Sequence, residues 1–295
     1  MRFDSNMIKN TFFFSCFWLC LTIVLNGCAD EGEWPSYLYL KPYTIAPQTN
    51  VGTSNQHIED YWVYTDNDLI GVFAPDRVAP VLKSGPHDIL IYPGVRTNGQ
   101  RDNANIYPFL APYTVNKNLC ACGKSDTIRP VFEYKSNVTF SFISDFEQFN
   151  IFNVDRDKDA QTKLYTESDT VFEGQVSGQL AVTEDHPTNI VGTSEFFTDY
   201  KSEPREIYLE LNYKSSALFE VGLEFEGSIK YPSATSIVGF YPSDKWKKVY
   251  INIAPYINDA DAKGGCRIVL FSVYNIGNPL KTQNVFVDNI KMIHF

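Results

Sequence analysis

Cysteines are the side chains of this chain whose spacing most directly suggests chemistry. Cys120 and Cys122 are separated by a single residue. A structural zinc site needs four ligands, and no second pair of Cys or His follows at usable spacing. Two outcomes remain for this pair, a disulfide or two free thiols, while the distant Cys266 is expected to be a buried thiol.

Catalytic motifs are not found in the sequence. It contains no HExxH, GxSxG or GxGxxG pattern, and its four histidines are scattered. A glycosidase needs two carboxylates about 5–10 Å apart. The 35 acidic residues offer too many pairs for the sequence to select one. We therefore expect a protein that is not an enzyme, with a surface glycan hydrolase as one alternative.

An apolar segment near the N-terminus has the features of a secretion signal. Arg2 and Lys9 precede the apolar residues 11–25. As a helix this run spans about 22 Å, which is less than the roughly 30 Å hydrocarbon layer of a membrane. The length and the basic start favour a signal peptide over residues 1–27.

The residues that follow the apolar run suggest a lipid anchor. Residues 25–28 read Leu-Asn-Gly-Cys and resemble the lipoprotein signal of bacteria, although Asn26 stands where Ala or Ser is usual. The resemblance implies lipidation of Cys28, and the acidic tether at 28–33 is similar to the surface-export signal of Bacteroidota lipoproteins. We expect an outer-membrane, lipid-anchored and surface-exposed protein. An uncleaved anchor, an ordinary signal peptide and a plain solvated spacer are the alternatives.

The composition indicates β structure. The chain has 22 Phe and 18 Tyr but only 3 Met, and aromatic residues favour strands over helices. Its 295 residues are enough for two domains. Its formal net charge of −10, without a cluster of Lys or Arg, predicts that it binds no nucleic acid.

The first domain is expected over residues 34–135. Short apolar and aromatic runs predict strands at 37–40, 58–64, 69–73, 78–82 and 87–92. Pro80 restricts its run to a sheet edge, and Pro93, Gly94, Asn98 and Gly99 indicate a long loop. Residues 113–119 and 127–134 are expected to form a hairpin. The order of strands and turns resembles Ig-like and PEGA-type β-sandwiches, which implies a spacer or docking module.

The second domain is expected over residues 136–295. Apolar residues alternate with polar ones in three runs, which are Ile207 to Tyr213, Phe219 to Phe225 and Val249 to Ile253. Alternation of this kind predicts strands with one buried face. Because no long helical period is present, we expect an all-β chain with two β-sandwich domains in tandem.

Short motifs in the second domain resemble those of a known fold. They occur in a fixed order, at 145–147, 177–180, 246–249 and 287–290. They look like the motifs of a galactose-binding-like jelly roll, the fold of many carbohydrate-binding modules. The resemblance implies that Glu147 and Asp288 share a structural Ca²⁺, the one cofactor expected here. The alternative is that Glu147 faces solvent and Asp288 only begins a bend.

Carbohydrate binding needs aromatic rings that stack on sugar faces. The candidates near predicted turns are Tyr200, Tyr231, Tyr241 and Trp246, although Trp246 could instead begin a buried strand. We expect a non-catalytic surface lipoprotein that binds a glycan or an envelope protein through the second domain. A structural subunit of an outer-membrane complex is the other alternative.

Overall fold

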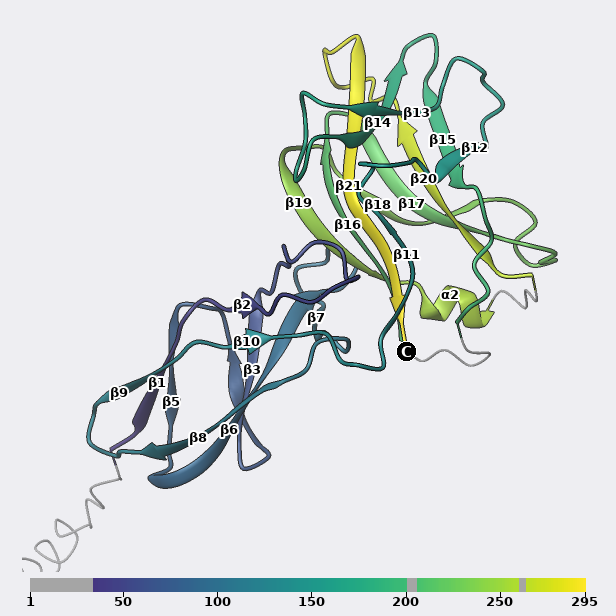
Figure 1. Ribbon diagram of the computed structural model, residues 1–295. Coiled ribbons are helices and arrows are strands. Elements are labelled where there is room, and N and C mark those ends of the chain that lie inside the picture. The colour runs from purple at the N-terminus through teal and green to yellow at the C-terminus, as the bar shows by residue number, and fades with distance from the viewer. Residues whose placement is uncertain (1–33, 201–205, 260–263) are drawn as a thin grey trace, which may run out of the picture.

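The computed structural model of the protein describes residues 34–200, 206–259 and 264–295. The expected signal peptide (1–27), lipidation site (Cys28) and acidic tether (28–33) lie outside the described residues. In the described part of the chain, no helix is long and apolar enough to cross a membrane. The fold is all-β, and its strands form two β-sandwich modules arranged end to end (Figure 1).

The first module contains ten strands in three sheets. The strands are β1 (Ser36–Leu40), β2 (Thr44–Ile45), β3 (Asp60–Thr65), β4 (Asp68–Phe73), β5 (Arg77–Val81), β6 (Gly85–Arg96), β7 (Ala104–Ile106), β8 (Tyr113–Leu119), β9 (Ser125–Ile128) and β10 (Val131–Phe132). The sheet orders are β5-β1-β9, β10-β2 and β4-β3-β6-β7, with β8 also paired to β6. As predicted, the proline-containing β5 lies at a sheet edge, where the missing N–H breaks no ladder bond.

The predicted loop is confirmed at Asn98 and Gly99, which form a turn, and is wrong at Pro93 and Gly94, because both lie inside the long strand β6. Pro93 falls where the neighbour of β6 changes from β8 to β7, so its missing N–H costs little, and its carbonyl accepts the Tyr107 N–H. At Gly94 a Cβ would lie 2.9 Å from the Cβ of Asp60 on β3. This glycine therefore allows two strands to approach closely and does not mark a turn.

The predicted hairpin between 113–119 and 127–134 is also wrong. Strand β8 pairs with β6, whereas β9 pairs in parallel with β1 in the other sheet. The connection between β8 and β9 therefore crosses from one sheet to the other. It carries the Cys120–Cys122 disulfide, whose Cα atoms are 5.2 Å apart.

The second module is a jelly-roll sandwich of a six-stranded and a five-stranded sheet. Its elements are β11 (Thr139–Ser144), β12 (Phe152–Asp155), β13 (Leu164–Glu167), β14 (Ser177–Thr183), β15 (Thr188–Thr193), β16 (Ile207–Ser215), β17 (Leu218–Phe225), β18 (Thr235–Phe240), β19 (Ser243–Asn252), α2 (Ala254–Asp259), β20 (Cys266–Val273) and β21 (Thr282–His294). The six-stranded sheet has the order β13-β14-β21-β16-β19, with β11 on β21, and the five-stranded sheet has the order β12-β15-β20-β17-β18.

The alternating apolar residues meet between these two sheets, as their pattern predicted. Leu209 and Leu211 of β16, Val221 of β17 and Ile251 of β19 are buried in one hydrophobic core. Cys266, at the start of β20, is a fully buried thiol whose burial raises its pKa to about 12.

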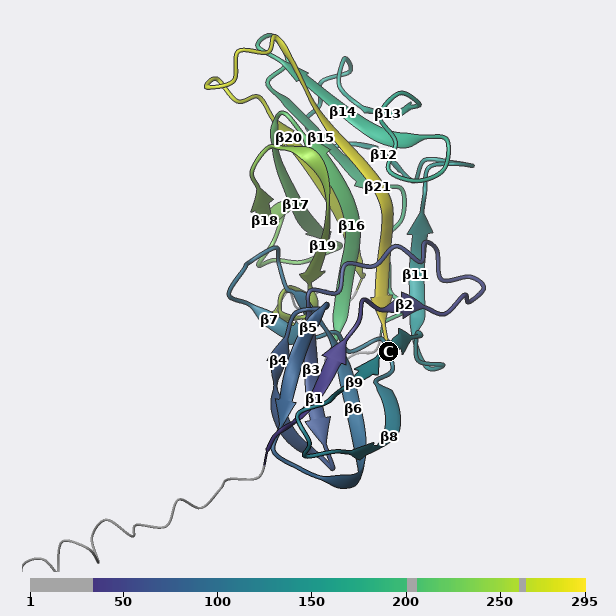
Figure 2. The same ribbon diagram turned by 90° about the vertical axis from the view of Figure 1, so that its left-hand side faces the viewer.

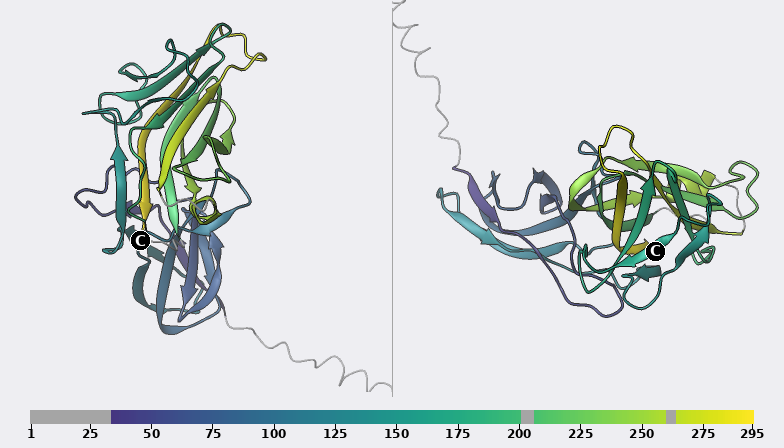
Figure 3. Two further views of the ribbon diagram at one scale, coloured as in Figure 1. Left: turned by 90° about the vertical axis from the view of Figure 1, so that its right-hand side faces the viewer. Right: turned by 90° about the horizontal axis from the view of Figure 1, so that it is seen from above.

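The outer face of the six-stranded sheet packs against the first module. Tyr208, Tyr250 and Ile293 belong to the hydrophobic core of the first module, although they lie on strands of the second. The ring of Tyr107 lies 5.1 Å from that of Tyr250, measured between centroids. The chain passes between the modules in the connection from β10 to β11, and its C-terminus also lies at this junction (Figures 2 and 3).

Candidate functional site

A groove of about 480 Å³ lies at the junction between the two modules. The first module contributes the segments 55–59 and 96–101, and the second contributes Phe172 and parts of β16 and β19. The volume is within the range of about 300–1,000 Å³ that is typical of small-molecule sites. Because β19 is the edge strand of its sheet, the groove follows that edge and residues on both faces of the strand line it.

An aromatic pair forms one wall of this groove. Successive residues of β19 point to opposite faces, and Val249 and Ile251 point into the core. Trp246 therefore lies on the outer face of the sheet, where it is half-buried. Its ring packs against Phe172, with centroids 5.7 Å apart and planes inclined at 60°. The pair gives the groove an apolar surface built from two different elements.

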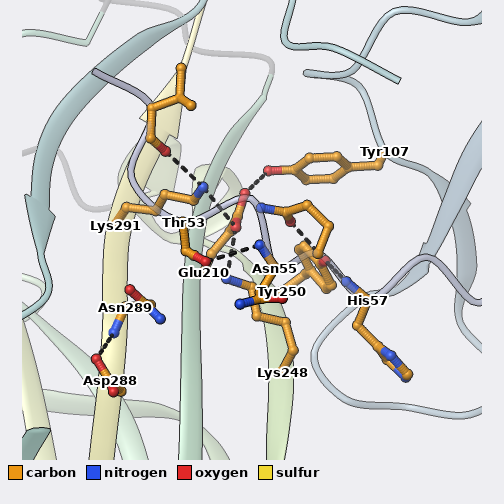
Figure 4. Close-up of polar contacts among 12 residues, drawn as sticks. Thr53, Asn55, His57, Tyr107, Glu210, Lys248, Tyr250, Asp288, Asn289 and Lys291 are labelled. Carbon is orange, nitrogen blue, oxygen red and sulfur yellow. Dashed lines mark hydrogen bonds and ion pairs between the residues drawn. The ribbon is translucent and has the colours of Figure 1, made fainter. Parts of the chain in front are cut away.

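The opposite wall is held in place by Tyr250. The hydroxyl of Tyr250 donates to Gln56 Oε1 at 2.9 Å and accepts the backbone N–H of His57 at 2.8 Å. Gln56 Nε2 in turn donates to the hydroxyl of Tyr134 at 2.9 Å. These bonds fix a segment of the first module over the second, and Figure 4 shows the contact between Tyr250 and His57.

A buried ionic cluster lies beside the groove, under the first module. Glu210 Oε2 is 3.0 Å from Lys248 Nζ and 3.4 Å from Lys291 Nζ. The hydroxyl of Tyr107 donates to Glu210 Oε1 (Figure 4). Lys291 Nζ donates to the hydroxyl of Tyr134 at 2.6 Å. We call these five residues, Tyr107, Tyr134, Glu210, Lys248 and Lys291, the junction cluster.

Burial and charge act in opposite directions on the pKa values of the junction cluster. Burial alone raises the pKa of Glu210, but the ammonium groups of Lys291 and Lys248 outweigh it and lower that pKa to about 2. Burial lowers the pKa of Lys291 to about 8, although Glu210 opposes this shift. Glu210 is therefore a carboxylate at neutral pH, and it lies between the Nζ atoms of Lys248 and Lys291.

No family model matches the chain. No curated protein matches it either. The similar solved structures include the family 30 carbohydrate-binding module of a cellulosomal cellulase of Clostridium thermocellum, at 15% identity and a TM-score of 0.33, over 44% of this chain and 80% of that one. They also include the family 22 carbohydrate-binding module of Clostridium thermocellum Xyn10B, at 12% identity and a TM-score of 0.37, over 52% of this chain and 94% of that one. Similarity at this level assigns no ligand to the chain.

The four aromatic residues selected from the sequence do not gather at one place. Trp246 lines the groove, as described above. Tyr200 packs on the core of the second module, and burial raises the pKa of its phenol. Tyr231 lies against Phe225 at a centroid distance of 5.5 Å, and Tyr241 is 84% exposed outside the groove.

The two carboxylates expected to share a calcium ion each bind backbone N–H groups of one loop. Glu147 Oε1 accepts from Gln175 at 2.7 Å and from Val176 at 3.1 Å. Asp288 Oδ2 accepts from Phe172 at 3.1 Å and also from the next residue. Among the described residues, no three acidic, His or Cys side chains are grouped to hold a metal ion. The calcium site stays a prediction, while the observed role of both carboxylates is to hold the loop that presents Phe172.

A second groove at the junction, of about 590 Å³, is lined by Trp62 and by several asparagines. The side-chain amides of these asparagines already form hydrogen bonds within the protein. Asn98 Oδ1 accepts the N–H of Asn252 at 3.1 Å, and Asn105 Nδ2 donates to Thr97 Oγ1 at 3.1 Å. With its amides occupied in this way, the second groove is a weaker candidate than the one at Trp246.

Sequence reasoning missed most of the groove. Phe172 lies in a loop without a periodic pattern, and Asn212 is an outward-facing residue on a strand whose inward face was predicted. Arg101 belongs to the first module, where no ligand contact was expected. The many polar residues that flank Trp246 are a sequence signal for a binding surface. They do not identify the rest of the groove, because its other residues depend on where the first module packs.

Proposed function

We propose that the protein is a non-catalytic glycan-binding protein and that the groove at the module junction is its binding site. The observation that carries this proposal is the pair formed by Phe172 and Trp246, a half-buried apolar surface in a polar groove. The C–H faces of pyranose rings pack on such aromatic surfaces, while the sugar hydroxyls need polar partners around them.

Polar groups beside the aromatic pair support the proposal. Asn212 lies on the groove floor opposite Lys248 in the pairing of β16 with β19. Its Oδ1 is buried and has no hydrogen-bond partner among the described residues. A buried acceptor without a donor is costly. A sugar hydroxyl would supply the missing donor once the Asn212 amide turns towards the groove.

The charge of the groove supports binding without hydrolysis. Among the residues that line it, Glu59 alone carries a carboxylate, and this carboxylate lies 3.7 Å from the guanidinium of Arg96. Glycoside hydrolysis of the common types needs two carboxylates on either side of the scissile bond. Glu59 has no such companion among the lining residues, so we assign the groove to recognition.

The proposal also includes attachment to the outer membrane through lipid on Cys28. The first described strand, β1, begins at the end of the first module that is remote from the junction (Figure 1). An anchor preceding β1 would therefore hold the groove away from the membrane, where it could meet glycans at the cell surface. Cys28→Ala is expected to release a folded protein from the membrane fraction, and unchanged membrane retention would contradict the anchor.

The glycan-binding proposal can be tested with paired aromatic substitutions in the full chain. A broad glycan array identifies ligands, and affinities are then measured by calorimetry. Trp246→Ala is expected to weaken binding at least about tenfold, because it removes the stacking surface. Tyr241→Ala is the matched control, since it removes an exposed ring outside the groove and should leave affinity unchanged.

Two results would overturn the glycan-binding proposal. One is the absence of binding to any glycan on an array that spans plant, mucin and microbial sugars. The other is equal binding by the wild type and by Trp246→Ala. Trp246→Tyr, which keeps an aromatic ring, is expected to retain most of the affinity, and this separates lost stacking from disturbed folding.

A further inference from the structure

The charged residues along the groove are mainly cationic, although the chain is acidic. Arg96, Arg101, Lys247 and Lys248 line the groove together with one acidic residue, Glu59. The whole chain has 35 acidic and 25 basic residues. A surface patch of average composition would therefore carry a net negative charge, whereas the residues that line the groove carry a net positive charge.

Two of these cations are neutralised by the protein and two are not. Arg96 Nη2 is 3.0 Å from a carboxylate oxygen of Asp60, and Lys248 faces Glu210 in the junction cluster. Arg101 and Lys247 are exposed, and neither side chain has a hydrogen bond or an ion pair with any described residue. Their charges are therefore available to a ligand.

The position of these two cations relative to the aromatic pair sets the size of the ligand. Lys247 follows Trp246 directly on β19, so the two side chains leave the strand on opposite faces. The loop that carries Arg101 is packed at the edge of this sandwich, because a Cβ on Gly99 would lie only 3.1 Å from the ring of Phe240. A ligand that contacts both the aromatic pair and the cations therefore has to extend around this edge of the sheet.

From this arrangement we propose that the groove selects acidic oligosaccharides, with one pyranose on Phe172 and Trp246 and a carboxylate or sulfate of a neighbouring unit at Arg101 and Lys247. The inference rests on the proposed glycan binding and specifies its ligand class. Carboxylates and sulfates accept charge-assisted hydrogen bonds from guanidinium and ammonium groups. They share this chemistry, and the experiment distinguishes them.

The expected size of the charge effect follows from the exposure of both cations. Exposed ion pairs are screened by solvent, so each cation is expected to change affinity by roughly threefold and both together by about tenfold. The Debye length is about 10 Å at 0.1 M salt. Affinity for an acidic ligand should therefore fall as NaCl is raised, whereas affinity for an uncharged ligand should change little.

The test compares matched ligands on the full chain in mild detergent. Oligogalacturonates are compared with their methyl esters for the carboxylate, and carrageenan oligosaccharides with their desulfated forms for the sulfate. We expect at least one acidic form to bind more tightly than its uncharged counterpart, and Arg101→Gln with Lys247→Gln to abolish that preference. The control removes two exposed cations outside the groove, Lys245→Gln with Lys281→Gln, and should keep the preference.

The possible failures are distinguishable. If uncharged glycans bind at a Trp246-dependent site as tightly as every acidic form, the charge inference is wrong while the proposed function stands. If the control variant loses the preference as fully as the groove variant, the preference comes from net charge and the inference is again wrong. If no glycan of the array or of the matched pairs binds, the proposed function is wrong and the inference falls with it.

Discussion

The outer face of the six-stranded sheet has two halves that differ in what covers them. In the half beneath the first module, Glu210, Tyr250 and Lys291 are at most 2% exposed. In the other half, Trp246 on the same strand as Tyr250 is half-buried and lines the groove. The strands are shared, so the difference arises from the first module, which converts one half of a polar face into an interior and leaves the other half facing the groove.

The two halves also differ in how their polar groups are satisfied. In the covered half, one carboxylate lies between two ammonium groups and also accepts a phenol hydroxyl. At the groove beside the open half, the cations Arg101 and Lys247 have no hydrogen-bond or ion-pair partner among the described residues. A buried charged group is tolerated only when it is paired. The covered half is therefore paired internally, whereas the groove beside the open half keeps two unpaired cations.

The largest effect is expected from Glu210→Gln in the covered half. The substitution keeps the shape of the side chain but leaves Lys248 and Lys291 buried without a counter-charge. Breaking a buried ion pair by removing one partner costs about 3–5 kcal/mol. Urea unfolding should show a loss of this size, together with earlier separation of the modules in limited proteolysis. A loss below about 1 kcal/mol would show that the covered half does not depend on its charges.

Acid is expected to weaken the covered half through the same carboxylate. The pKa of Glu210 is about 2 in the folded protein and 4.5 as the reference value, so the unfolded chain binds more protons between these values. Stability therefore falls as the pH decreases from about 4.5 towards 2. The carboxyl group of Asp288 has the opposite effect on stability at higher pH. Burial raises its pKa to about 6, so the folded state binds this proton more tightly than the unfolded chain does. Unfolding measured against pH should be flatter below 4.5 in Glu210→Gln than in the wild type.

A smaller loss is expected from Lys248→Gln. The side chain of Lys248 is 4% exposed, and its ammonium group lies 3.0 Å from Glu210. Lys291 remains 3.4 Å from the same carboxylate after the substitution, and the glutamine amide can still donate to it. We therefore expect a loss of about 1–3 kcal/mol in urea unfolding, the usual cost of leaving a buried polar group without its partner. A loss as large as that of Glu210→Gln would mean that the two cations are not interchangeable.

Much of the fold was predictable because it depends on local periodicity. The alternation at Leu209 and Leu211 identified strands and their buried faces, since a strand that covers a core must point every second residue inward. Turn residues were less reliable. Pro93 and Gly94 lie inside a strand because of a change of neighbouring strand and a close approach to Asp60. Such contacts come from residues distant in sequence and leave no local pattern.

The candidate site was predictable only in part, for a related reason. Trp246 was selected for its residue type, but its face of the sheet depends on the register of β19. Glu210 looked like any polar residue of an alternating strand, and only the position of the first module makes it an interior group. Phe172 reaches the groove because Glu147 and Asp288 bind the backbone of its loop. Each of these relations joins segments that are far apart in the chain.

The smallest effect is expected from Lys247→Gln, and this substitution gives the sharpest form of the comparison. Lys247 and Lys248 are adjacent on β19 and carry the same charge, but Lys247 is exposed at the groove and has no ion-pair partner among the described residues. Exposed substitutions away from special contacts usually change stability by less than about 0.5 kcal/mol. Urea unfolding should therefore leave Lys247→Gln within about 0.5 kcal/mol of the wild type, while Lys248→Gln is clearly destabilised. If both variants lose the same stability, burial beneath the first module does not distinguish Lys248 from Lys247, and the contrast between the covered half and the groove loses its structural basis.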